Sequence, residues 1–254
     1  MFWRAKSPLE RDDEVWQLDC WAWLLRHCGG IVALRATALV LPTRDFFKPS
    51  SATGHAFAAD LLDQVAAYFG FEPGDIRLVP QRPSVNPHVG SYAVVMNAPA
   101  SPLGTYSESE KGATITYDPR LVDKPSALIA TLAHELCHAR LFRIPAPPPG
   151  DWDMEEFATD LAVTFFGFGV FNANEASRFE TYSDPATGAQ GWRFDGGGYL
   201  SPAERAFALA MFLALTRRDP APVARHLGGS AAAYFGKSVK YLTANPKLVS
   251  RLTG

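Results

Sequence analysis

The sequence predicts an α+β fold, with a small sheet and helix region first and a helical C-terminal part after it. Short β-branched segments are confined to the first half of the 254-residue chain, and helical periodicity dominates from Pro125 onward. Strands and helices that are segregated along a chain are typical of α+β folds. We expect an N-terminal helix and strand region over residues 1–50, packed on a core domain that covers residues 51–254.

The first half begins with helical signals. A first helix is expected from about Asp12 to Cys28, where two glycines follow and stop it. The β-branched run 31–41 predicts one or two strands. Apolar residues at helical spacing predict an amphipathic helix over residues 54–69, which Gly70 ends.

Three short strands are expected next, separated by loops rich in proline and serine. They cover residues 76–80, 92–97 and 113–118. A helix over residues 125–142 follows and cannot continue into the loop 145–150, because its prolines lack the amide donor and clash with the preceding turn.

The remaining chain is predicted to be largely helical. A second helix is expected over residues 153–168, and the glycine-rich stretch 172–200 is expected to be irregular. The sequence Ser-Pro-Ala-Glu at 201–204 is a capping box with proline at the first helical position, so a helix should begin there and run to about Arg217. A last helix is expected over residues 230–244.

Composition points to an ordinary cytoplasmic globular protein. The net charge of −2 and pI near 6.3 offer no large positive field for nucleic acid or an anionic membrane. The chain starts without the apolar stretch of a secretory peptide, and no segment has the roughly 20 apolar residues that span a bilayer. Three cysteines form no disulfide framework, so reduced thiols are expected.

The chemistry is concentrated in the segment His134-Glu135-Leu136-Cys137-His138. Histidines four apart on a helix lie on one face, so both imidazoles can reach one metal ion. Glu135 lies at the edge of that face, where it can touch a metal-bound water without being a ligand. The alternative is two ordinary histidines with Glu135 as a surface charge. Cys137 flanks the metal face without lying on it and is expected to pack in the core.

The surroundings of this helix favour the metal site. Its apolar residues fall on one side, opposite the histidines and Thr131. We expect the apolar side to pack on the core and the polar side to face an enclosed metal site, so that neither side faces open solvent. The apolar set is Leu128, Ile129, Leu132 and Leu136.

The class of metal site depends on the third ligand. A metzincin needs glycine and histidine where this chain has Leu141 and Ile144. A peptide deformylase needs an upstream cysteine in a setting that neither Cys20 nor Cys28 resembles. Both classes are therefore excluded.

A carboxylate from the next helix remains. That helix is apolar on most sides, which predicts that it is buried. Glu156 and Asp160 would then be core carboxylates one turn apart, and such groups need a metal or a charged partner. Either carboxylate could be the third ligand, and Glu155 is a further candidate.

The pattern His134-Glu135-x-x-His138 followed by Glu156-x-x-x-Asp160 resembles the gluzincins, the zinc peptidases that thermolysin typifies. The short spacing between the two helices is similar to that of compact cytosolic peptidases of the ImmA/IrrE type. The resemblance covers residues 125–168. It implies a zincin-like fold, with Zn²⁺ held by the two histidines and Glu156, and with Asp160 orienting His134.

We therefore expect a zinc metallopeptidase that acts on peptide or protein substrates, with Glu135 as the general base on a zinc-bound water. Two alternatives remain: a catalytically silent zincin-fold binding module, and a zinc hydrolase of non-peptide amides. A purely structural zinc is disfavoured because such sites are usually closed by four ligands rich in cysteine.

Other parts of the site are less clear from sequence. The segment 112–118, just upstream of the metal helix, is a candidate edge strand for pairing with an extended substrate, and an interior strand is the alternative. An oxyanion needs a further donor. Tyr199 is the first candidate, and His226 and Tyr182 are others.

Overall fold

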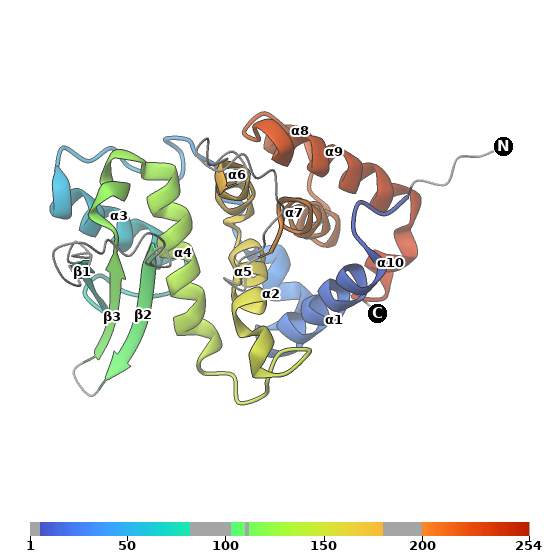
Figure 1. The fold of residues 1–254 in the computed structure, drawn as a ribbon, viewed down its shortest axis with the longest axis horizontal. Helices are drawn as coiled ribbons and strands as arrows, with labels where there is room; N and C mark the ends of the chain where they lie inside the picture. Colours follow the sequence, from blue (N-terminus) through green and yellow to red (C-terminus); the bar gives the residue numbers. More distant parts are fainter. Residues whose placement is uncertain (1–5, 82–102, 110–111, 180–199, 254) are drawn as a thin grey trace, which may run out of the picture. The chain divides into compact units, whose positions relative to one another are not determined.

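The computed structural model describes residues 6–81, 103–109, 112–179 and 200–253 (Figure 1). The chain divides into two compact units, Ser50–Ala139 and a second unit made of Met1–Pro49 with Arg140–Gly254. Helices dominate the described residues, which contain one three-stranded sheet. This agrees with the predicted α+β class. Among the described residues, no helix is both long and apolar enough to cross a membrane.

The unit Ser50–Ala139 contains the sheet. Strand β3 lies in the middle, parallel to β1 on one side and antiparallel to β2 on the other. Ile115 at the centre of β3 pairs with Leu78 of β1 and Tyr106 of β2. The elements are α3 (Gly54–Tyr68), β1 (Ile76–Pro80), β2 (Gly104–Ser109), β3 (Gly112–Tyr117), the 3-10 helix η1 (Pro119–Asp123) and most of α4 (Pro125–Leu141).

Helix α4 runs alongside the sheet of this unit (Figure 1). Its apolar side is fully packed, with Leu128, Leu132 and Leu136 at 0% exposure. Ile115 of β3 is also fully buried. The apolar side of the predicted metal helix therefore anchors it in the core, as its periodicity indicates.

The other unit is helical. Helix α7 is its centre and contacts α2, α5, α6, α9 and α10. Its start is the predicted capping box: the Ser201 hydroxyl accepts from the Glu204 amide, and the Glu204 carboxylate accepts from the Ser201 amide. The elements are α1 (Arg11–His27), α2 (Gly30–Ala36), η2 (Trp152–Met154), α5 (Glu155–Phe165), α6 (Gly169–Phe179), α7 (Pro202–Thr216), α8 (Ala221–Ala224), α9 (Gly229–Ala244) and α10 (Pro246–Ser250).

Two predictions of local structure are wrong. The run 31–41 begins with helix α2 and not with a strand, because Gly29 and Gly30 at φ of 90° and 72° turn the chain and let a new helix start at once. Helix α6 occupies the first part of the stretch 172–200, which was expected to be irregular. The predicted strand 92–97 lies outside the described residues.

The N-terminal region packs closely on the end of α5. The amide of Val40 donates to the carbonyl of Gly167 at 3.0 Å. A Cβ at Gly167 would lie 1.9 Å from the carbonyl oxygen of Ala38, and its φ of 94° is in the left-handed region. Only glycine allows the two backbones to come this close, so residues 37–40 are in direct contact with the turn that follows α5.

Candidate metal centre

The two histidines of α4 face one another. The Nε2 atoms of His134 and His138 are 3.2 Å apart, and the rings are inclined at 76°. Zn–N bonds of about 2.0–2.1 Å at a tetrahedral angle separate two ligand nitrogens by about 3.3–3.4 Å. The imidazoles are therefore spaced as two ligands of one ion.

The polar face of α4 is also shielded. Thr131, His134 and Glu135 are 8%, 8% and 5% exposed, and His138 is half-buried. A glutamate with so little contact with water belongs to an enclosed site and not to a solvated surface. The interpretation of Glu135 as a surface charge is therefore wrong.

A carboxylate from α5 completes the set. One ligand atom from each of His134, His138 and Glu156 lies within 4.8 Å of the other two, which is close enough for all three to hold one metal ion. Glu156 is partly exposed and not buried as expected, because it lies in the first turn of α5, before the fully buried stretch that begins at Ala158.

The chemistry of these donors fits zinc. Two imidazoles and one carboxylate are the protein ligands of many catalytic Zn²⁺ sites, which keep a further position for water or substrate. Other divalent transition metals also accept imidazole and carboxylate ligands, so the geometry supports a site for a divalent transition metal.

Asp160 is a core carboxylate, as predicted. Its Oδ2 accepts from the Nε of Arg205 at 2.8 Å and from the amide of Leu200 at 3.0 Å. The metal ion was the expected partner of this buried charge, whereas the observed counter-charge is Arg205. Its role in orienting His134 stays a prediction.

This ion pair ties three elements together. Besides Asp160 of α5, Arg205 of α7 donates through Nη1 to the carbonyl of Asn172 in α6 at 3.1 Å. The side-chain amide of Asn172 donates to the backbone carbonyl of Asp160 at 2.9 Å. Sequence reasoning missed Arg205, although it is the one cation inside the otherwise apolar run of α7, which is a signal that it has a buried partner.

Gly104 is a second residue that sequence reasoning missed. It opens β2 and packs against α4, where an added Cβ would lie 2.9 Å from Oε1 of Glu135 and 2.7 Å from Cγ2 of Thr131. Real Cβ atoms do not approach neighbours so closely, so the β2 backbone reaches Glu135 only because residue 104 has no side chain. No local pattern in the sequence distinguishes this glycine from one in a loop.

The candidate substrate strand must be corrected. The segment 112–118 contains β3, which pairs with β1 and β2 and has no free edge among the described residues. The alternative of an interior strand is right. Within the described part of the sheet, β2 is the outer strand that lies beside Glu135.

The candidate oxyanion donors remain open. Tyr199 and Tyr182 lie outside the described residues. His226 is half-buried, and its backbone carbonyl accepts from the side chain of Asn174 at 2.8 Å. Its catalytic role stays a prediction.

The three cysteines are free, as expected. Cys137 of α4 is fully buried. Burial raises the pKa of Cys28 to about 11 and shifts that of Cys20 upward as well. A raised pKa keeps both groups as unreactive thiols at neutral pH.

Comparison with known proteins gives no family for this chain. It matches no protein-family model, and neither the curated proteins nor the solved structures yield a match.

Proposed function

We propose that this protein is a zinc-dependent peptidase of the gluzincin type, with His134, His138 and Glu156 as metal ligands. The observation that carries the proposal is the convergence of these three donors within 4.8 Å, next to the enclosed carboxylate of Glu135. A bare metal-binding site has no need for such a base, whereas hydrolysis does.

The chemistry would be shared between the ion and the chain. Bound zinc would lower the pKa of water towards about 7 and polarise the scissile carbonyl. Glu135 would take the proton from the attacking water and deliver it to the leaving amine. Its low exposure, 5%, favours this role because the carboxylate is held in an enclosed site on the same helix as His134 and His138.

Strand β2 is the proposed place for the substrate backbone. It pairs with β3 on one side, and its first residue, Gly104, lies against Glu135. An extended peptide added along the outer side of β2 would gain main-chain hydrogen bonds and bring its scissile bond towards the base. This replaces β3 as the strand expected to pair with substrate.

The test is a Glu135→Gln variant compared with wild type for zinc content and for cleavage of a mixed peptide library. We expect one zinc per chain in both proteins and a loss of hydrolysis of about 10²–10⁴-fold in the variant. Equal hydrolysis would refute the role of Glu135. Bound zinc without cleavage of any peptide by wild type would refute the peptidase and leave a binding module or a hydrolase of other amides.

A further inference from the structure

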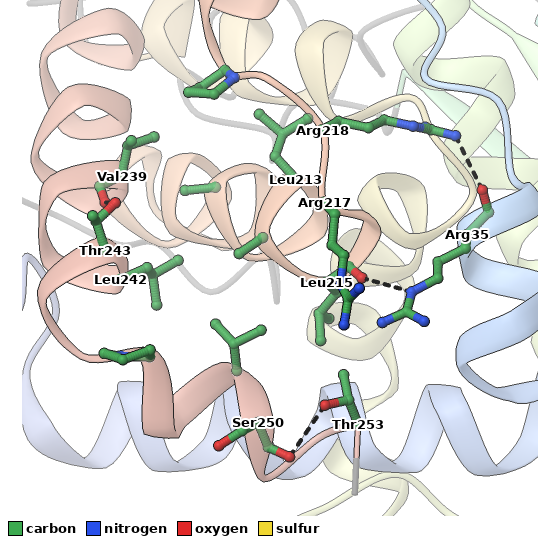
Figure 2. Close-up of a pocket in the computed structure, with 15 residues that line it drawn as sticks. Arg35, Leu213, Leu215, Arg217, Arg218, Val239, Leu242, Thr243, Ser250 and Thr253 are labelled. Carbon is green, nitrogen blue, oxygen red and sulfur yellow. Dashed lines mark hydrogen bonds between the residues drawn. The ribbon is translucent and has the colours of Figure 1, made fainter.

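A pocket remote in sequence from the proposed metal ligands lies among the C-terminal helices (Figure 2). Its volume of about 400 Å³ is within the range of pockets that hold small organic ligands. Residues of α7, α9 and α10 line it, together with Arg35 of α2. All of these residues belong to one compact unit.

The inner part of this pocket is apolar. Leu213, Leu215 and Leu242 line it and are 2%, 1% and 4% exposed. Val239 of α9 and Val249 of α10 add half-buried aliphatic surface. A ligand that enters would therefore need an apolar body.

The charged residues that line the pocket all have the same sign. They are Arg35, Arg217 and Arg218, and no acidic residue lines it. In Figure 2 the side chains of Arg35 and Arg217 point toward one another. Two cations that approach without an anion between them repel, so this arrangement favours a negatively charged occupant.

The arginines have donors to spare. Arg35 uses Nε on the Leu215 carbonyl, 3.2 Å away, which holds its guanidinium in place. The Arg217 backbone amide donates to the carbonyl of Ala214 at 3.3 Å, but its guanidinium has no hydrogen-bond or ion-pair partner among the described residues. Nη1 of Arg218 is buried and has no hydrogen-bond partner among the residues that the structure describes. Burial lowers the pKa of the Arg218 side chain.

Arg217 also has an unusual backbone. It ends α7 with φ of 57° and ψ of 38°, the left-handed conformation that glycine adopts most easily at this position. Glycine would be the better residue for the helix end alone. A long cationic side chain here, aimed into a pocket, therefore suggests a function for the side chain.

The surrounding charge points the same way. Residues 201–254 contain eight lysines and arginines and two acidic residues, whereas the whole chain has a net charge of −2. The C-terminal part is thus basic on an acidic protein, and its field would attract an anion towards this pocket.

We propose that this pocket binds a small amphipathic anion, with its carboxylate or phosphate on Arg217 and Arg35 and its apolar body among Leu213, Leu242 and Val249. Guanidinium groups suit both kinds of anion because they offer paired donors. This site is independent of the proposed peptidase chemistry.

The experiment is calorimetric titration of the full chain with n-octanoate and n-octyl phosphate, against 1-octanol and acetate as probes of the apolar and charged parts alone. We expect at least one of the two amphipathic anions to bind about tenfold or more tightly than both controls. The better of the two identifies the headgroup. Octanol binding as tightly as both anions, or no binding of either anion, would overturn the proposal.

Variants assign the binding to this pocket. Arg217→Gly should weaken binding about tenfold while leaving the unfolding midpoint unchanged or higher, because glycine suits the left-handed position. Thr243→Glu, at the exposed rim, should weaken it as well by repelling the anion. Arg225→Gln makes the same charge change as loss of Arg217 at an exposed residue that does not line the pocket, and should bind like wild type. If Arg217→Gly and Thr243→Glu both bind like wild type, the anion does not occupy this pocket.

Discussion

The guanidinium of Arg205 and the carboxylate of Asp160 form a buried ion pair, with Nε 2.8 Å from Oδ2 and the two side chains 9% and 1% exposed. Arg205→Met should therefore destabilise the protein by about 3–5 kcal/mol, because it leaves the Asp160 charge buried without its partner. Urea denaturation measures this change. The double variant Asp160→Leu with Arg205→Met should recover much of the loss, since no buried charge remains.

The pair between Asp118 and Arg120 is the matched control. Arg120 Nε donates to both oxygens of Asp118, but the arginine side chain is 86% exposed. Arg120→Gln should leave the urea denaturation midpoint nearly unchanged, because water screens an exposed ion pair. If Arg205→Met lowers the stability no more than Arg120→Gln does, the buried pair does not stabilise the fold as predicted.

Metal binding should depend on each ligand. Wild-type protein dialysed against zinc should contain one ion per chain by elemental analysis, and His138→Ala and Glu156→Gln should each lose it or bind it far more weakly. A metal at 100 times its dissociation constant would raise the free energy of unfolding by about 2.7 kcal/mol, and a chelator should remove that gain. His226→Ala and Glu155→Gln are the controls and should keep the metal. Loss of metal in Glu155→Gln with retention in Glu156→Gln would move the third ligand to Glu155.

Gly104→Ala should reduce hydrolysis without removing metal, because the new Cβ would lie 2.9 Å from Glu135 Oε1 and must displace either the base or β2. A cost in stability of about 1–3 kcal/mol is also expected from this overpacking. Turnover and zinc content are measured together with thermal unfolding. Gly236→Ala in α9 is the control: nothing lies within 4 Å of its added Cβ, so it should stabilise the helix by roughly 0.5–1 kcal/mol. Full activity in Gly104→Ala would show that the close approach has no catalytic importance.

The thiols should react slowly near neutral pH. Burial raises the pKa of Cys28 to about 11, so at pH 7.5 only a small fraction is thiolate, and alkylation should speed up as the pH rises towards that value. Mass spectrometry after iodoacetamide treatment measures the extent of labelling. Protein unfolded in urea should label at all three cysteines, whereas fast labelling of native Cys28 at pH 7.5 would contradict the assignment.

The parts of the fold that periodicity and end signals specify were predictable. The capping box at Ser201 predicted the start of α7. The helix that contains His134 and His138 was predicted from apolar residues at helical spacing. These features depend on neighbours in sequence. The strand β2 was missed because Gly-Thr-Tyr-Ser-Glu-Ser has little apolar alternation and is stabilised by its pairing with β3.

The sequence predicted the three residues of the candidate site that lie close together, but not two residues that pack around it. His134 and His138 follow from their i, i+4 spacing, and Glu156 from the search for a carboxylate in the next helix. Arg205 and Gly104 act through residues far away in sequence, and their partners become visible only when the chain is folded. Asp160 shows the difficulty: its burial was predicted, but its counter-charge was not.

The hydrogen bond from the Leu200 amide to Asp160 has a consequence for engineering. Together with the capping box at Ser201, it ties the first turn of α7 to a core carboxylate of α5. A designer who replaces Asp160 should therefore lose this anchor of α7 together with the partner of Arg205. Changes at residues that contact neither should leave the start of α7 in place.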